Sequence, residues 1–282
     1  VFNRQRVDQM YKLAEELEET EPPMVGGLEW CFEDEKDPTK ITGVQFVEHK
    51  DGYIKIYDPA VIENIDKNDF NRFVGGWDVA EGLEQGDYSY GCYMDRATMN
   101  VFLEWHGHID TDKLAEEQAK ISYLLENKDI IGKERNSPGL STITQVEGWS
   151  LHQFQERSYA KGKDMQYVPH DLTGKTGFFT NKVNKEVITD RLNMYIREFW
   201  FFHPGKDFWD ECSTFVHDAR GRRGAQGKHK NPGIRCFDDR VMGTALCLEC
   251  HNGADQYLAK PAETVQTVTN VILTETQKCV GY

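Results

Sequence analysis

The sequence predicts an α+β fold, in which hairpins of strands and separated helices share one protein body. Helical and strand-like spacing of apolar residues occur in different stretches, and turn residues separate them. A hydrophobic fraction of 39% and an aromatic fraction of 12% are typical of a globular chain. The 282 residues suffice for one large domain or two small ones. We predict a single domain over 1–282, with a division into 1–132 and 133–282 as the alternative.

The first predicted elements are a helix, a hairpin and a second helix. Apolar residues recur at helical spacing over 4–19, and Glu21-Pro22-Pro23 ends that helix. Residues 41–57 are typical of a β-hairpin, because β-branched residues flank a turn that contains glycine. Asp58-Pro59 resembles a capped helix start, and we expect this helix to continue to Val74 before Gly75-Gly76.

Two more strands and a helix follow. Aromatic and β-branched residues dominate 88–94 and 99–105, which favours strands. Asp110 or Thr111 is the expected N-cap of a helix that ends near Leu125. Residues 133–180 contain short strand-like pieces among glycine, serine, threonine and lysine, and their pattern assigns no element.

The last third of the chain begins with the clearest buried helix. This helix is predicted over 184–202, and a shorter one over 206–217. Residues 220–230 form a basic, glycine-rich segment that predicts a loop. Alternating valine and threonine over 263–274 favours a terminal strand.

The formal net charge of −14 indicates an acidic surface, which repels phosphates and anionic lipids. We therefore predict no nucleic-acid partner. No apolar run approaches the length that crosses a bilayer, so no membrane span is expected. Residues 1–20 are charged throughout and do not resemble a signal peptide, so an exported protein would begin after signal removal.

The most specific motif is Cys247-x-x-Cys250-His251. This is the attachment pattern of c-type haem. Two thiols at this spacing can each add to one vinyl group at a haem edge, and the next histidine then lies below the iron as a ligand. The sequence therefore predicts one covalent haem c, with Cys247 and Cys250 as attachment residues and His251 as iron ligand.

Over 245–253 the chain resembles the c-type cytochromes, and the resemblance does not extend further. It implies an electron carrier, alone or as a subunit of a larger redox complex, with another cytochrome as a partner. It also implies a periplasmic or extracellular location, or the mitochondrial intermembrane space. A haem with an open sixth position would instead make the protein a haem oxidoreductase.

The sixth iron ligand would have to precede the motif, because neither methionine nor histidine follows His251. His217 and His229 are the nearest histidines in sequence, and Met242 is the nearest methionine. The other candidates are His49, His106, His108, His152, His170 and His203.

A basic segment precedes the motif and offers two interpretations. Its side chains would pair with haem propionates or attract an acidic partner, or they would be a solvated loop. The segment contains Arg220, Arg222, Arg223, Lys228, Lys230 and Arg235.

Three alternatives to haem remain open. The first is a zinc-stabilised structural or binding protein that uses Cys236, Cys247, Cys250 and His251. The second is a non-haem iron oxygenase with His108 and Asp110 as ligands and His203 or His217 as the third. The third is a partial resemblance to HNH nucleases through Val216-His217-Asp218, although one Cys-x-x-Cys pair and an asparagine of that pattern are missing.

Other sources of chemistry are not evident from the sequence. Paired carboxylates, phosphate-binding loops and nucleophile motifs are not found in a usable context, so no catalytic residue is assigned. If two cysteines bind haem, five remain, and in an oxidising compartment these could form two disulfides with one thiol left over. The five are Cys31, Cys92, Cys212, Cys236 and Cys279.

Overall fold

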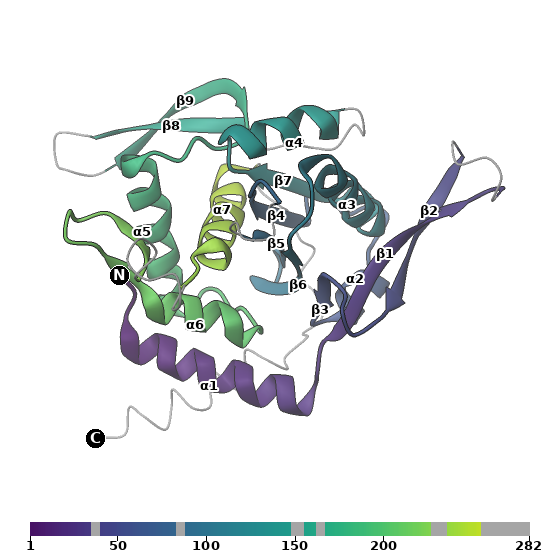
Figure 1. Cartoon of the computed structure of the whole chain (residues 1–282), viewed down its shortest axis with the longest axis horizontal. Coiled ribbons are helices and arrows are strands. Elements are labelled where there is room, and N and C mark those ends of the chain that lie inside the picture. Colours follow the sequence, from purple (N-terminus) through teal and green to yellow (C-terminus); the bar gives the residue numbers. More distant parts are fainter. Residues whose placement is uncertain (35–39, 83–87, 148–154, 162–166, 227–235, 255–282) are drawn as a thin grey trace.

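A seven-stranded mixed sheet forms the centre of the computed structural model (Figure 1). The structure describes residues 1–34, 40–82, 88–147, 155–161, 167–226 and 236–254. The strand order is β2-β1-β3-β6-β5-β4-β7, and β7 is parallel to β4 while the other pairs are antiparallel. The strands are β1 (Met24–Phe32), β2 (Ile41–Glu48), β3 (Ile54–Ile56), β4 (Phe73–Asp78), β5 (Ser89–Asp95), β6 (Asn100–Gly107) and β7 (Asp129–Lys133).

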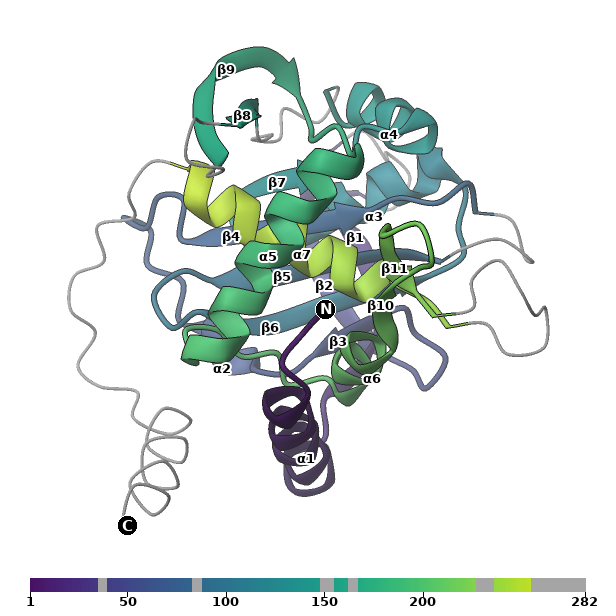
Figure 2. The same cartoon turned by 90° about the vertical axis from the view of Figure 1, so that its left-hand side faces the viewer.

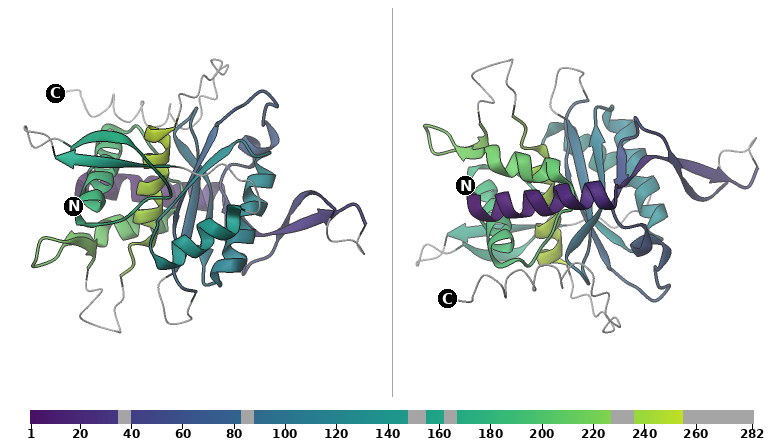
Figure 3. Two further views of the ribbon diagram at one scale, coloured as in Figure 1. Left: turned by 90° about the horizontal axis from the view of Figure 1, so that it is seen from above. Right: turned by 90° about the horizontal axis from the view of Figure 1, so that it is seen from below.

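Helices cover both faces of this sheet (Figures 2 and 3). On one face, α7 packs against β4, β5 and β7, α5 and α6 pack against α7, and α1 lies beside α5 and α6. On the other face, α3 lies against the sheet and α4 lies beside α3. The helices are α1 (Arg4–Thr20), α2 (Pro59–Glu63), α3 (Thr111–Leu124), α4 (Ser137–Glu147), α5 (Lys182–Glu198), α6 (Lys206–Thr214) and α7 (Asp239–Gly253).

The central strands are buried on both faces. Every residue of β5 and β7 is buried, including Ser89, Asp95 and Lys133 at the strand ends. Such strands lack the alternation of polar and apolar residues that a half-exposed strand shows. The helices therefore hold the ends of β4 and β7 in a fixed position.

Glycines let α7 approach the sheet closely. A Cβ atom at Gly76 of β4 would collide with the backbone nitrogen of Cys247, and one at Gly132 of β7 would collide with the Sγ atom of Cys250. Backbones at this separation leave no space for a side chain on the strand. The contact between α7, β4 and β7 therefore depends on glycine at both positions.

Several sequence predictions are confirmed. The helix expected over 4–19 is α1, and the strands expected over 88–94 and 99–105 are β5 and β6. The helix expected from Asp110 or Thr111 is α3, and the buried helix is α5, which begins two residues earlier than expected. The mixed α+β class is also correct.

The helix predicted from Pro59 to Val74 is wrong. Its cap is real, because the Asp58 side chain accepts a hydrogen bond from the Ala60 N–H, but α2 ends at Glu63. Phe73 then begins β4, and Gly75-Gly76 lie inside that strand. These glycines permit close packing of Tyr93 and α7, rather than ending a helix.

The hairpin predicted over 41–57 has the right strands but the wrong pairing. β2 and β3 do not pair with each other; both pair with β1, which the sequence analysis did not identify. β1 and β2 extend away from the rest of the molecule (Figure 1).

Two small hairpins complete the described structure. β8 (Gln155–Lys161) pairs with β9 (Tyr167–Thr176), and β10 (Phe215–His217) pairs with β11 (Arg223–Ala225). The short helix predicted over 206–217 therefore ends at Thr214, before β10 begins. The strand predicted over 263–274 lies outside the described residues. Of the helices that are described, none combines the length and apolar character needed to cross a membrane.

Candidate active site

The Cys247-x-x-Cys250-His251 motif lies in the C-terminal half of α7, against the sheet. Both cysteines are buried, with exposures of 0% and 1%. The Cys247 Sγ donates to the carbonyl of Val74 at 3.2 Å, and Cys250 fills the space above Gly132. His251 is partly exposed, and its Nδ1 accepts a hydrogen bond of 3.4 Å from Arg96.

The prediction of haem c is wrong. Thioether bonds need both sulfurs at the edge of a haem pocket, whereas here β4 and β7 occupy the space next to them. Burial, followed by the nearby Cys92, raises the pKa of the Cys247 thiol, so it is not a thiolate. Burial and then Arg96 lower the pKa of His251 to about 4. The motif is a packing sequence on a buried helix.

Of the three preferred sixth ligands, His217 and Met242 are among the described residues, and neither forms a haem site with the motif. His217 is exposed on β10, where its Nε2 accepts a 3.3 Å hydrogen bond from Arg223. Met242 is buried in α7 itself, and His229 lies outside the described residues. Arg220, Arg222 and Arg223 lie in the β10–β11 hairpin, and the other basic residues of their segment are outside the described part.

The zinc and iron alternatives are also wrong. Cys236 precedes the start of α7, while Cys247 lies about 12 Å along the helix from Asp239, given a rise of ~1.5 Å per residue. A tetrahedral zinc site spans far less than that. Asp110 is the N-cap residue of α3, and the His108 ring lies against the Tyr88 ring at a tilt of 33°, with 3.8 Å between the ring centres. Across the described ranges, no three His, Cys, Asp or Glu side chains form a ready metal site.

Carboxylates instead gather where β4, β7 and α7 meet. Asp78 is the last residue of β4, and Glu134 directly follows β7. Trp77 pairs in parallel with Lys133, so the next residue on each strand lies side by side, and the Glu134 N–H donates to the Trp77 carbonyl at 3.0 Å. Asp238 and Asp239 add two more carboxylates at the first turn of α7.

The electrostatics of Asp78 show how close these groups are. Burial raises the pKa of Asp78 well above its usual range, and Glu134 raises it further by charge and by a side-chain hydrogen bond. Asp239 and Asp238 then add smaller contributions in the same direction. The neighbouring negative charges disfavour ionisation of Asp78, and its side chain is hydrogen-bonded to Glu134.

Neighbouring polar groups position the cluster. The Asn136 side-chain amide donates to Glu134 Oε2 at 2.9 Å. The Lys185 ammonium donates to Asp238 Oδ2 at 3.0 Å. Asn136 follows β7 and Lys185 lies on α5, so these two bonds hold the Glu134 and Asp238 carboxylates in place from different parts of the chain.

Glu211 of α6 fixes the start of α7. Its Oε2 accepts hydrogen bonds from the N–H groups of Arg240 and Val241, at 2.8 and 3.4 Å, and its Oε1 accepts one from the Arg240 guanidinium at 2.9 Å. Glu211 thus provides the capping that the Asp238 side chain does not provide. The side chains of Asp238 and Asp239 are therefore not needed to cap their own helix.

A buried polar network supports the same end of α7. The Glu104 carboxylate accepts from Tyr57 Oη at 2.8 Å and from Tyr90 Oη at 3.3 Å, while Tyr90 contacts His203 Nε2 at 2.8 Å. Burial alone would raise the pKa of Glu104, but Arg240, Lys55 and His203 outweigh it and lower it to about 2. Burial lowers the pKa of His203 to about 4. The network therefore combines an ionised glutamate with a neutral histidine at neutral pH.

The donor set of the cluster suits a hard divalent cation. Asp78, Glu134 and the Asp238–Asp239 pair offer only carboxylate oxygens, which Mg²⁺ and Mn²⁺ prefer. In the described residues Asp78 is hydrogen-bonded to Glu134, and the four carboxylates do not surround a single ion position. Ionised Asp78 would offer its carboxylate oxygens to a cation.

These residues were missed in the sequence. Asp78 was missed because the predicted helix took in the first two residues of its strand and no element was predicted for the rest, and Glu134 because the pattern of 133–180 assigned no element. The available signals were an apolar strand that ends in an acid, Phe73–Asp78, and an acidic pair before a buried helix, Asp238-Asp239. Asp78, Glu134 and Asp238-Asp239 are far apart in the sequence. Only the parallel pairing of β4 with β7 and the packing of α7 bring them together.

Comparison with known proteins gives structural similarity alone. No family model and no curated protein matches the chain. A large terminase nuclease of thermophilic phage G20c is 13% identical over 71% of this chain and 90% of its own, with a TM-score of 0.48. The large terminase nuclease domain of Thermus phage P74-26 is 15% identical over 75% and 92%, with a TM-score of 0.46. The human cytomegalovirus terminase nuclease domain has a TM-score of 0.41, at 9% identity over 69% of this chain and 94% of its own.

The remaining predictions built on haem are corrected with it. The cytochrome resemblance, the electron-transfer role, the redox partner and the periplasmic, extracellular or intermembrane-space location all required a haem that the packing of α7 excludes. The exclusion of nucleic acid does not hold either, since it used the net charge of the whole chain and ignored how charges are distributed over the surface.

Proposed function

We propose that this protein is a divalent-cation-dependent nuclease that hydrolyses phosphodiester bonds at the Asp78–Glu134–Asp239 cluster. The observation that carries the proposal is the convergence of carboxylates from the ends of two parallel strands and the start of a buried helix. Burial and mutual repulsion of these acids are unfavourable for stability, which is typical of functional sites.

The topology supports this proposal. β4, β5 and β6 form an antiparallel meander, α3 follows, and β7 returns in parallel beside β4. This arrangement is consistent with an RNase H-like nuclease fold. Support from fold is an analogy, and the site residues themselves carry the chemistry.

The roles of the chain's own residues follow from their positions. Asp78, Glu134 and Asp239 would hold the cation, and Asn136 keeps the Glu134 carboxylate oriented. A bound divalent cation lowers the pKa of water and neutralises charge that develops on phosphoryl oxygens. Lys185 holds Asp238 at one side of the cluster, next to the carboxylates that influence Asp78.

A plasmid-nicking assay with the purified full chain tests the proposal. We expect cleavage with Mg²⁺ or Mn²⁺ and none with EDTA. Asp78→Asn and Glu134→Gln should each lower the rate by at least about 100-fold, because loss of a ligand exceeds the ~10–100-fold cost of losing an outer hydrogen bond.

Asp112→Asn is the matched control. Asp112 is an exposed acid in the first turn of α3, as Asp239 is a buried acid in the first turn of α7. This variant should cleave like the wild type. Cleavage that persists in Asp78→Asn, or that needs no cation, would exclude the proposed function.

A further inference from the structure

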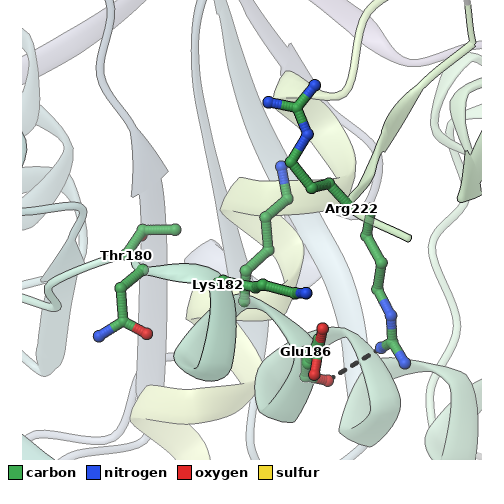
Figure 4. A pocket seen from close by; sticks show the side chains of 7 residues that line it. Thr180, Lys182, Glu186 and Arg222 are labelled. Carbon is green, nitrogen blue, oxygen red and sulfur yellow. Dashed lines mark hydrogen bonds between the residues drawn. The ribbon is translucent and has the colours of Figure 1, made fainter. Parts of the chain in front are cut away.

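A basic pocket opens between the start of α5 and the β10–β11 hairpin (Figure 4). Its volume is about 280 Å³. Lys182, Lys185 and Glu186 line it from α5, and Arg222 and Arg223 line it from the hairpin, with Thr180 at one end. With Asn181, seven side chains line the pocket; four of them are cationic and one is anionic, on a chain whose net charge is −14.

The pocket adjoins the carboxylate cluster along two routes. Lys185 lines the pocket and also contacts Asp238 at 3.0 Å. The segment that leads into the pocket runs beside Glu134, since Phe178 forms a parallel bridge with Glu134 and Thr180 is two residues further on. A group bound in the pocket would therefore lie beside the candidate cleavage site.

The basic side chains differ in how firmly they are anchored. Arg223 is fixed, because its Nη1 donates to the Glu186 carbonyl at 2.9 Å and to the Thr189 hydroxyl at 2.7 Å. Arg222 binds Asp218 through Nε and Nη2, which uses only part of a guanidinium with five N–H donors. Lys182 is exposed at the first position of α5, where the helix dipole also favours an anion.

Apolar side chains next to the pocket indicate what kind of anion it takes. Phe179 and Val183 are 49% and 43% exposed, and they flank the 180–182 segment. The Arg135 guanidinium lies 5.7 Å from the centre of the Phe179 ring, and the Asn184 side chain holds the Phe179 carbonyl at 2.8 Å. An exposed aromatic ring beside a cationic pocket suits a base and its phosphate better than a lone inorganic anion.

We propose that this pocket binds a backbone phosphate of a polynucleotide strand, with Lys182 and Arg222 as its contacts and Phe179 as a stacking surface for the adjacent base. The inference rests on the proposed function in one respect: the bound strand is the substrate, and its bound phosphate lies beside the bond to be cleaved. Recognition of phosphate without base edges makes the binding independent of sequence.

Binding of a short fluorescein-labelled single strand to the full chain in EDTA tests the pocket, because hydrolysis is then off. Lys182→Glu/Arg222→Glu should weaken binding at least about tenfold and reduce the slope of log K against log salt by about one. Lys12→Glu/Lys113→Glu is the control: it changes the net charge equally at exposed positions on α1 and α3, and it should bind like the wild type. Phe179→Ala should weaken binding without changing the salt slope.

Circular dichroism melting of each variant separates misfolding from lost contacts, and Lys182→Ala replaces the double variant if that one is unfolded. Equal strand affinity in the wild type and in folded Lys182 and Arg222 variants would overturn the pocket, even if inorganic phosphate binds there. Cleavage would still stand in that case. Conversely, the wild type could bind the strand more tightly than the variants and yet show no cleavage. That result would support the phosphate pocket and exclude the proposed nuclease function.

Discussion

The two ends of α7 differ in almost every physical respect. The first turn carries Asp238 and Asp239 next to the acids of β4 and β7, and Glu211 caps it from outside. The last turns carry Cys247 and Cys250, which are buried against glycines of the same two strands. One end therefore accumulates charge that a packed core disfavours, and the other end maximises close packing.

An unusual sequence pattern and the residues of the proposed site can thus lie about two turns apart on one helix. The cysteine spacing is the more unusual sequence, yet the structure uses it as small apolar packing. The acidic pair Asp238-Asp239 is common in sequence, yet the tertiary structure brings it near Asp78 and Glu134, where the negative charges repel one another. The predictions below treat the two ends as separable.

The largest effect is expected for Asp239→Asn, which should lower cation-dependent cleavage by at least about 100-fold. The same variant should fold, because Glu211 rather than Asp239 caps α7. Nicking kinetics and thermal melting measure both properties. Cys247→Ala, two turns away, should retain cleavage, and comparable loss of cleavage in both variants would show that the two ends are not separable.

The next effect is a loss of stability in acid. Below pH 6.5, His203 must gain a proton in the unfolded chain but resists it in the folded one, because burial lowers its pKa to about 4. Glu104 adds a second loss as pH falls from 4.5 towards its folded pKa of about 2, amounting to about 3 kcal/mol. Urea unfolding across pH 7 to 3 checks this.

Glu104→Gln should remove the second of these losses and destabilise the chain at neutral pH, since Lys55 and Arg240 keep Asp207 but lose the buried charge of Glu104. His217 is the control histidine because it is exposed on β10. His217→Gln should leave the acid dependence unchanged. Burial raises the pKa of Asp129 to about 6, which has the opposite sign, so the comparison is with His203→Gln: the same change in unfolding free energy between pH 6.5 and 4 in that variant and in the wild type would contradict the role assigned to His203.

A smaller effect tests packing at the other end of α7. Gly132→Ala should destabilise the fold by about 1–3 kcal/mol, because the added methyl group meets the Cys250 sulfur. Cys250→Ala removes that sulfur, so the double variant should be more stable than the sum of the single changes. Urea unfolding of the four chains gives the coupling, and additive effects would show that Cys250 is not the contact.

The smallest effect is expected for Glu211→Gln. The amide keeps an oxygen for the α7 backbone N–H groups but loses the charge that pairs with Arg240. We expect a loss of about 1 kcal/mol in stability and a modest decrease in cleavage rate. An unchanged rate together with reduced stability would limit Glu211 to a structural role.

Local patterns in the sequence were sufficient for elements that are stabilised along their own length. The spacing of Val7, Met10 and Ala14 identified α1, and the capping position at Asp110 located the start of α3. Periodicity fixes which face of a helix is apolar before any tertiary contact forms. The α+β class followed from the same patterns.

Only the tertiary structure decided what the glycines, cysteines and acids do. Gly75-Gly76 is locally typical of a helix stop, but these residues lie in a strand that pairs with β5 and β7 and packs closely against α7. Asp78 and Glu134 are far apart in sequence and become neighbours through the parallel pairing of β4 with β7. Side-chain chemistry depends on which groups meet across strands and helices, and that meeting is fixed by long-range pairing rather than by spacing along the chain.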